Sequence, residues 1–225
     1  MRSISVVINA RLQSTRVPNK LIRPFSGSTL IEIALEKLNV LDFFEHRFLG
    51  VADPELKKKV KSFENVQILD RDEDSVKSGV NPPKISFAHY LKIPSDYIFI
   101  FNPCQPALSI ETIKKAYDYF QRTTFLSYTS AVETRDWIFD HNGNCLTNKD
   151  TNNYSTNKGK VFYKAAHSFH IVSKDFFKRN GYHWTFTSDD PHLISVPIEE
   201  TVDVDTEHDF KIAELYYGYE FRNKV

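Results

Sequence analysis

Residues 4–21, ISVVINARLQSTRVPNKL, join a short β-branched run to a basic loop. The initial run is too short for a helix or a membrane span, so it predicts a buried strand. Arg11, Arg16 and Lys20 follow within the loop, separated by small and polar residues. The carboxyl end of a parallel strand is a common site for anions, and Arg and Lys supply complementary donors there. A phosphate-binding loop and a solvated basic loop are both compatible with this cluster of cations.

Two small residues in the loop, Ala10 and Ser14, would let backbone N–H groups approach a bound phosphate chain. The chain contains neither G-x-x-x-x-G-K-[ST] nor G-x-G-x-x-G. The ordinary P-loop and Rossmann dinucleotide signatures are therefore absent, and a phosphate site here would depend on the side-chain cations.

The whole chain has no net charge, because its 225 residues include 29 Lys or Arg and 29 Asp or Glu. This balance gives nucleic acid no general electrostatic attraction, so any anion site must be local. Cys104 and Cys145 lie far apart without a C-x-x-C partner, which argues against disulfides and a structural zinc site. With no apolar leader or membrane-spanning run in the sequence, we expect a cytoplasmic protein that binds neither membrane nor nucleic acid.

Alternating strand and helix patterns follow the basic loop. Thr29 and Glu32 form a capping-box pattern ahead of apolar residues at helical spacing, which predicts a helix over 29–38. Residues 97–101, YIFIF, have the continuous apolar character of a central parallel strand. Together these patterns predict an α/β fold, a three-layer sandwich with a mostly parallel sheet. Further strands are expected at 48–52, 66–69, 125–132, 168–172 and 194–197, and further helices at 56–63, 85–91, 110–120 and 175–180.

Polar residues follow two of the predicted strands at one edge of the sheet. Arg71 comes after the third strand and could contact a ligand or pair with Asp70, Asp72 or Asp74. Asn102 follows the central strand and begins a turn that two prolines stiffen. Because open α/β sheets bind ligands at the carboxyl ends of their strands, Arg71 and Asn102 are candidate binding residues.

Residues 133–160 are more polar than their surroundings and form an excursion from the predicted sheet. Asn142 and Gly143 predict a hairpin turn between residues 137–139 and 145–147. The apolar side chains of this excursion favour a lid or a dimer arm, although residues 148–160 could instead be disordered. The histidines between residues 167 and 192 have spacings that match no zinc site, so we expect satisfied or solvent-facing side chains.

The segment TVDVDTEHDF, residues 201–210, places two carboxylates close together near the end of the chain. Its alternation predicts a strand with Asp203 and Asp205 on one face, about 7 Å apart. A hard divalent cation held by one or two carboxylates and substrate phosphates would suit this pair. A polar outer strand face is the alternative. Asp209 has a separate explanation, as the carboxylate of a helix cap that begins at Thr206.

Three segments together resemble the cytidylyltransferase family that activates sialic acid and related sugar acids, the CMP-sugar synthetases. ARLQSTRVPNKL is similar to that family's A-R-x-x-S-x-x-x-P-x-K triphosphate loop. FNPCQPALSIETI is similar to its L-Q-P-T-S-P-L-R segment, and VDVDTEHDFKIAE to its D-I-D-T-x-x-D segment. The three motifs keep the family's order and spacing across most of the chain.

The resemblance implies a set of roles. Arg11, Ser14 and Lys20 would contact the phosphates of CTP, Arg71 would border the nucleotide, and Asp203 and Asp205 would bind Mg²⁺. Ala10 and Asn102 would complete the nucleotide site, and Arg11, Lys20 and the two aspartates would be the catalytic group. The implied fold is a nucleotide-diphospho-sugar transferase-like single domain over residues 1–225, dimeric through an inserted arm that matches 133–160. The implied reaction converts CTP and a sugar acid into CMP-sugar and pyrophosphate.

The chain departs from the family pattern at several positions. Leu21 follows the loop lysine in place of Asn, Asn102 and Cys104 replace Gln and Thr, and Ser109 replaces Arg. The N-G-A segment appears as residues 166–168, AHS. The turn after the central strand has no carboxylate, which favours the sialic-acid branch over the octulosonate (Kdo) branch. An inactive nucleotide-binding protein on the same fold, or a glycosyltransferase with a D-x-D motif, remains the alternative function.

Overall fold

The computed structural model describes residues 1–77, 81–147 and 155–222. A seven-stranded sheet in the order β5-β4-β1-β6-β8-β7-β9 forms its centre, and a small hairpin pairs β2 with β3. The strands are β1 (Ile4–Asn9), β2 (Pro24–Phe25), β3 (Ser28–Thr29), β4 (Arg47–Val51), β5 (Gln67–Asp70), β6 (Tyr97–Phe101), β7 (Tyr128–Thr134), β8 (Phe162–Ser173) and β9 (His192–Ser195). The helices are α1 (Leu30–Val40), α2 (Pro54–Val60), α3 (Pro83–Ser86), α4 (Ile110–Arg122), α5 (Lys174–Asn180) and α6 (Glu207–Arg222), joined by 3₁₀ helices that include η1 (Glu73–Val76), η2 (Ala88–Lys92), η3 (Thr156–Lys158) and η4 (Ile198–Glu200).

The order of the strands explains where a ligand would bind. β1 pairs in parallel with β4 on one side and with β6 on the other, and β4 continues in parallel to β5. From β1 the chain adds β4 and then β5 on one side, and it next returns to add β6 on the other side of β1. Such a switch point opens a crevice at the carboxyl ends of the two strands. Among the described strands of the seven-stranded sheet, β8 alone runs antiparallel to its neighbours, β6 and β7.

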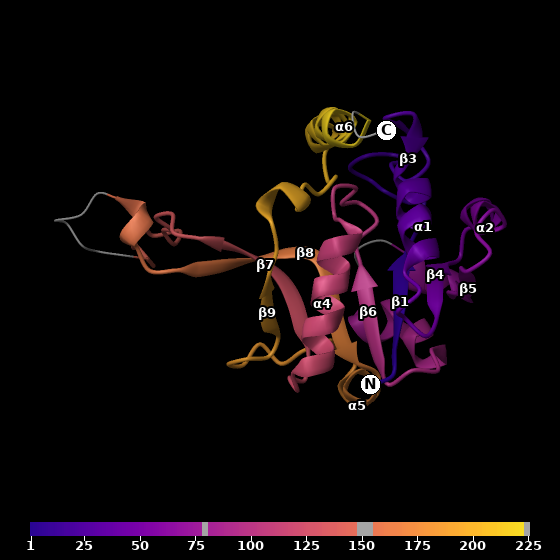
Figure 1. Ribbon diagram of the computed structural model, residues 1–225, viewed down its shortest axis with the longest axis horizontal. Coiled ribbons are helices and arrows are strands. Elements are labelled where there is room, and N and C mark those ends of the chain that lie inside the picture. The colour runs from indigo at the N-terminus through magenta and orange to yellow at the C-terminus, as the bar shows by residue number, and fades with distance from the viewer. Residues whose placement is uncertain (78–80, 148–154, 223–225) are drawn as a thin grey trace.

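Helices cover both faces of the sheet, which confirms the predicted α/β layering. On one face, apolar residues of α1, α2, α4 and α6 pack in one cluster with alternate residues of the strands. On the other face, Tyr90 of η2 and Phe177 of α5 pack against Val7 and Ile98. Figure 1 shows α1 and α4 lying along the strands and α6 beyond the carboxyl end of β6. β1 is thus buried on both sides, as its apolar sequence predicts.

Local sequence signals place the helix ends correctly. The side chain of Thr29 accepts a hydrogen bond from the N–H of Glu32 at the start of α1. Ser109 does the same for Thr112 at the start of α4, and α5 ends at Gly181, which has a positive φ of 74°. These caps depend on neighbours in the chain and need no tertiary contact to be recognised.

Two predicted elements are wrong. Residues 202–205 form no strand, although the segment is extended and Val204 is buried. The N–H of Val204 donates to the carbonyl of Cys104 at 3.0 Å, so the segment lies against the loop after β6 and makes no strand ladder. The helix predicted over 85–91 is broken at Phe87, where α3 ends and η2 begins.

The polar excursion extends away from the body of the molecule from the ends of β7 and β8 (Figure 1). Its described part contains a hairpin closed by a bridge between Phe139 and Cys145, with Gly143 at a positive φ of 82° in the turn. The predicted hairpin is therefore confirmed. Residues 148–154 of the excursion and 78–80 of the turn-rich passage after Arg71 lie outside the described residues. In the ranges that are described, no helix has the length and apolar character needed to cross a membrane.

Candidate functional site

A cleft of about 280 Å³ lies at the switch point between β1 and β6. Three segments meet there: the basic loop after β1, the turn after β6, and the segment that leads into α6. Its lining residues are Asn9, Arg11, Ser14, Thr15, Arg16, Lys20, Leu21, Asn102, Pro103, Cys104 and Asp205. The fold therefore brings together a basic and an acidic motif that lie almost 190 residues apart, as the Arg16–Asp205 hydrogen bond spans 189 positions.

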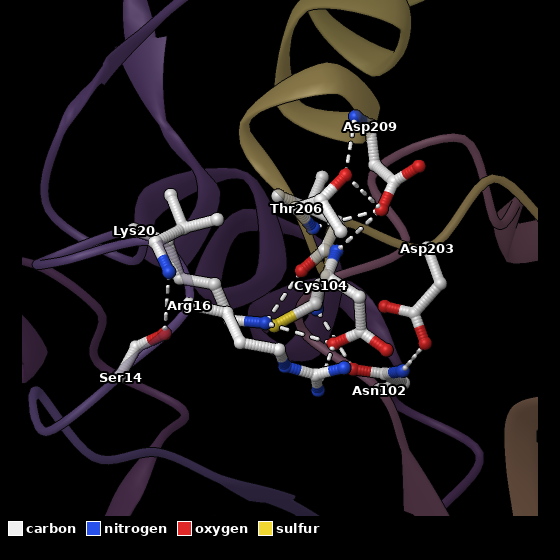
Figure 2. A network of polar contacts seen from close by, with 11 residues as sticks. Ser14, Arg16, Lys20, Asn102, Cys104, Asp203, Thr206 and Asp209 are labelled. Atoms are coloured by element: carbon white, nitrogen blue, oxygen red, sulfur yellow. Dashed lines mark hydrogen bonds and ion pairs between the residues drawn. The ribbon is translucent and has the colours of Figure 1, made fainter.

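Two cations of the basic loop hold the acidic segment in place. Arg16 Nη2 lies 2.7 Å from Asp205 Oδ1, and Lys20 Nζ lies 3.6 Å from the same oxygen. Lys20 Nζ also donates to the carbonyl of Val204 at 2.5 Å. Figure 2 shows Arg16 and Lys20 reaching from the loop toward the segment that carries Asp203. The side chain of Lys20 is only 16% exposed, so its charge is screened less than that of Arg16, at 65%.

Asp203 is largely enclosed and only half satisfied. Its Oδ2 accepts a hydrogen bond of 3.0 Å from Asn102 Nδ2, while its Oδ1 is buried without a hydrogen-bond partner among the described residues. Asn102 is itself fixed, because its Oδ1 accepts from the N–H of Cys104 at 2.9 Å. Burial raises the pKa of the Asp203 carboxyl, and the nearby Asp205 raises it further. Lys20, Gln105 and Asn102 favour the ionised form, but burial and Asp205 outweigh them.

The chemistry of these two carboxylates would suit a divalent cation whose other ligands are phosphate oxygens. The unpartnered Asp203 Oδ1 lies beside the charge of Asp205, and a cation would compensate both. Across the described residues, no group of three or more His, Cys, Asp or Glu side chains is arranged to hold a metal. The donor set thus suits Mg²⁺ bound through one or two carboxylates and phosphate oxygens, but does not form a closed protein cage.

A second cleft of about 330 Å³ adjoins the first and shares Asn9 and Arg11 with it. Arg71 lines this second cleft, and its Nη2 donates to the carbonyls of Ser86 at 3.0 Å and Ser75 at 3.4 Å. Burial lowers the pKa of Arg71, and its Nε is buried without a partner in the described part of the chain. The guanidinium lies in a cleft wall and is held by backbone carbonyls.

Arg71 does not pair with the acidic residues near it in sequence. Asp70 pairs with Lys57 at 2.7 Å, and Asp74 pairs with Lys77 at 2.5 Å. Within the described ranges no ion pair joins Arg71 to Asp70, Asp72 or Asp74, so that alternative is wrong. The basic loop is likewise more than a solvated surface, because Lys20 and Arg16 are engaged across the cleft.

The other predicted residues have different positions. Arg11 lines both clefts, and its Nη1 donates to the carbonyl of Val76 at 3.1 Å. Ser14 lines the first cleft, and its Oγ accepts from the N–H of Val17 at 3.3 Å. Ala10 is buried in the core, and its N–H donates to the carbonyl of Gly50 at 3.0 Å. Ala10 therefore offers no free N–H to a ligand, contrary to the expectation for a small loop residue.

The buried ammonium of Lys37 holds the turn after β6 in place through hydrogen bonds to its backbone. Lys37 of α1 donates to the carbonyls of Pro106 and, at 2.7 Å, Leu108. Burial lowers the pKa of Lys37 to about 8, and the negative charge of Glu200 acts in the opposite direction, raising this pKa. Glu200 in turn accepts from the N–H and the hydroxyl of Ser109, both at 2.9 Å. Ser109 thus ties the start of α4 to the segment that leads to Asp203.

Cys104 is a structural part of this turn. It is buried, and burial raises the pKa of its thiol to about 11. A thiol with such a pKa is protonated at neutral pH and is a poor nucleophile. Covalent catalysis through Cys104 is therefore disfavoured.

Arg16 and Asn9 line the cleft, but the resemblance assigned neither of them a role in the nucleotide site. Arg16 lies in the basic loop between Arg11 and Lys20, and this position in the sequence indicated that it could line the same cleft. Asn9 is the last residue of β1, and its side chain meets His89 and Tyr90, about 80 positions away. No local pattern could have indicated that contact.

The sequence profile of the cytidylyltransferase family matches residues 5–215. This range includes the basic loop, both clefts and the acidic segment. The chain belongs to the cytidylyltransferase family. Among curated members, the 3-deoxy-manno-octulosonate cytidylyltransferase of Francisella tularensis subsp. tularensis (strain FSC 198) is 29% identical over 121 residues. The match covers 52% of this chain and 45% of that relative, so it spans about half the length of each.

Solved structures of low sequence identity share the fold of this family member. One is a CMP:2-keto-3-deoxy-manno-octonic acid synthetase complexed with CTP, at a TM-score of 0.68 and 11% identity, covering 97% of this chain and 100% of that chain. Another is the 4-diphosphocytidyl-2C-methyl-D-erythritol synthase from Anaerococcus prevotii DSM 20548, at a TM-score of 0.66 and 14% identity, covering 96% and 98%. These relatives are not named for sialic acid, so the predicted sialic-acid branch stays a prediction.

Proposed function

We propose that this protein is an Mg²⁺-dependent enzyme that transfers the cytidylyl group of CTP to a sugar acid and releases pyrophosphate. The observation that carries the proposal is the contact of Arg16 and Lys20 with Asp205, next to the unpartnered Asp203 Oδ1, at the β1/β6 switch point. Membership of the cytidylyltransferase family supports cytidine as the nucleoside.

The cations of the cleft have two alternative anionic partners. In the structure, Arg16 and Lys20 form ion pairs with Asp205. When CTP enters, its phosphates compete for these cations, and Asp203 and Asp205 become available to hold Mg²⁺. The bound ion would supply charge neutralisation between the carboxylates and the phosphates. Arg11, which lines the same cleft, adds a third cation to the phosphate site.

The reaction is a displacement at phosphorus. The oxygen of the sugar acid's anomeric hydroxyl forms a bond to the α-phosphorus of CTP, and the bond from that phosphorus to the oxygen that bridges it to the β-phosphorus breaks. The bridging oxygen leaves with pyrophosphate, and the hydroxyl proton passes to solvent water. Negative charge grows on the leaving pyrophosphate, and the fixed cations Lys20 and Arg16 stabilise it electrostatically. Asn102, which lines the cleft, keeps Asp203 oriented through the 3.0 Å hydrogen bond.

The second cleft is the natural place for the pyrimidine. It is continuous with the phosphate site through Asn9 and Arg11, and the buried Arg71 Nε is an N–H donor without a protein partner in the described ranges. A base carbonyl or ring nitrogen would satisfy this donor. Cytosine N3 accepts a hydrogen bond whereas uracil N3–H donates one, so a contact from this donor to N3 would discriminate between the two bases.

The acceptor belongs to the class of sugar acids with an anomeric hydroxyl next to a carboxylate. The lack of a carboxylate in residues 102–106 favours a nine-carbon, sialic-acid-like substrate, whereas the curated relatives are named for an eight-carbon octulosonate. Both substrates present the same reacting hydroxyl. A panel of eight- and nine-carbon acids, assayed under identical conditions, assigns the branch.

The experiment that tests this function is pyrophosphate release from CTP, UTP, GTP and ATP, each with Mg²⁺ and each member of the sugar-acid panel. We expect turnover with CTP and one class of acid, and a loss of at least 100-fold in Asp203→Asn. CTP-dependent thermal stabilisation without turnover on any acid would favour the inactive nucleotide-binding alternative. Turnover of Asp203→Asn at the wild-type rate would contradict the role of the carboxylates.

We also propose that the protein is a homodimer joined through the excursion at 133–160. Its described part carries apolar side chains that remain accessible, among them Phe139 at 55% and Leu146 at 56% exposure. Exposed apolar groups of this size on an extended hairpin favour burial against a second copy.

A further inference from the structure

The two clefts meet at Asn9, whose amide is held by two aromatic side chains. Asn9 lines both clefts and is partly exposed. Its Oδ1 lies 2.8 Å from His89 Nε2, and its Nδ2 donates to the hydroxyl of Tyr90 at 2.6 Å. Both partners belong to η2 and are buried, at 3% and 0% exposure. One side of the amide is therefore fixed within the protein and the other side faces the ligand space.

The neighbouring strand leaves room for this arrangement. A Cβ at Gly50 of β4 would lie 2.9 Å from both Asn9 Oδ1 and His89 Nε2. Contacts that short are not tolerated, so only glycine allows the amide and the imidazole to meet at this point. The glycine is required for a close approach and not for its own backbone conformation, because no positive φ is recorded at Gly50.

The hydrogen bonds fix which atoms of Asn9 face the cleft. Burial lowers the pKa of His89 to about 3, and Arg71 lowers it further, so the imidazole is neutral. With Nε2 protonated, His89 donates to Asn9 Oδ1, and the amide nitrogen must then point toward Tyr90. One of its two N–H groups is donated to the Tyr90 hydroxyl. The second has no partner among the described residues.

We propose that Asn9 binds the nucleoside part of the nucleotide through this second N–H, and that His89 and Tyr90 are positioning residues that hold the amide. The inference rests on the proposed function, since it requires a nucleotide with its phosphates near Lys20 and its base near Arg71. Such a ligand must pass over Asn9, where the clefts join. The group that accepts the hydrogen bond is an oxygen of the ribose or of the pyrimidine.

The test compares two buried tyrosines that differ in location. Tyr90→Phe removes the hydroxyl that holds Asn9. Tyr128→Phe is the matched control, because Tyr128 is also fully buried and its hydroxyl is hydrogen-bonded to Thr123, at the opposite edge of the sheet. Affinities for CTP and for inorganic tripolyphosphate are measured by calorimetry. The second probe contains the phosphates and lacks the nucleoside.

We expect Tyr90→Phe to weaken CTP binding about 5-fold, the effect of one hydrogen bond, and to leave tripolyphosphate binding unchanged. Tyr128→Phe should change neither affinity. Asn9→Ala should weaken CTP binding at least as much, and adding Tyr90→Phe to it should cause no further loss, because the tyrosine acts through the asparagine. His89→Phe should weaken CTP binding by about the same factor as Tyr90→Phe. His89→Gln, which keeps an amide N–H donor, should retain much of the wild-type affinity for CTP.

Nucleotide analogues identify the acceptor. If it is the ribose 2′-hydroxyl, the penalty of Tyr90→Phe disappears with 2′-deoxy-CTP; if it is the base, the penalty persists. Wild-type CTP affinity in Asn9→Ala and Tyr90→Phe, or equal losses for CTP and tripolyphosphate, would overturn the inference. A protein that binds CTP in this pattern yet releases no pyrophosphate would contradict the proposed enzyme function and leave the role of Asn9 intact.

Discussion

Replacing Lys37 with methionine should change how the stability of the protein depends on pH. The aliphatic stem of Lys37 is partly exposed, but its ammonium is buried beneath the turn that carries Pro106 and Leu108. Burial lowers the pKa of Lys37 to about 8 from its ordinary value of 10.5, although Glu200 and Glu36 favour the charged form. Below pH 8 the lysine is charged in the folded and unfolded states, so its contribution to stability is constant.

Between pH 8 and 10.5 the unfolded chain binds more protons at Lys37 than the folded protein does, so the free energy of unfolding rises with pH. Each pKa unit is worth about 1.4 kcal/mol, which gives a total rise of about 3 kcal/mol. Lys37→Met has no titrating group there and leaves two carbonyls without a donor, which costs stability at every pH.

Urea unfolding at pH 7, 8, 9 and 10.5 measures the effect. The wild-type free energy of unfolding minus that of Lys37→Met should increase by about 3 kcal/mol across this range, and titrations common to both proteins cancel in the difference. If this difference stays constant within about 0.5 kcal/mol, the pKa of Lys37 is not lowered by burial and the reasoning is refuted. A fall with pH would show that the carboxylates outweigh burial.

Three further predictions concern the site and the arm. Because burial and Asp205 raise the pKa of Asp203, its ionised form costs stability as pH rises; Asp203→Asn should therefore unfold at a higher urea concentration near neutral pH while losing turnover. Gly50→Ala should lower the free energy of unfolding by about 1–3 kcal/mol and weaken CTP binding, measured by urea titration and calorimetry. Phe139→Ser combined with Leu146→Ser should shift the mass in light scattering from dimer to monomer, and an unchanged mass would contradict the arm as the interface.

Sequence patterns identify the parallel half of the fold because each signal there is local. The capping box at Thr29 and the Ser109 cap each involve residues within one helical turn. The apolar run of residues 97–101 reflects burial on both faces, which any central parallel strand experiences. Such features can be read from a window of ten residues, and the structure places the corresponding elements within a few positions of the prediction.

The acidic segment shows where local patterns fail. Alternation at 202–205 satisfies the rule for a strand, but a strand also needs a neighbour with a free edge. The N–H of Val204 instead donates a hydrogen bond to the carbonyl of Cys104, about 100 positions earlier. The carbonyl of Val204 accepts a hydrogen bond from Lys20 Nζ. The prediction that Asp203 and Asp205 serve one site depends on chemistry and not on the strand, so it remains a coherent proposal after the strand is lost.

Some of the unpartnered polar atoms belong to residues of the candidate site. Among the described residues, buried side-chain atoms without a hydrogen-bond partner include Asp203 Oδ1, Arg71 Nε, His89 Nδ1 and Gln105 Oε1. Each such atom costs about 1–3 kcal/mol in a protein interior. Arg71 follows β5 and lines the second cleft, and Gln105 follows β6. Arg2 Nη2, before the start of β1, is also unpartnered, so these atoms are not confined to the clefts. The proposed nucleotide and metal ion would supply partners for Arg71 Nε and Asp203 Oδ1. Stabilising substitutions at these positions should therefore come at the expense of activity.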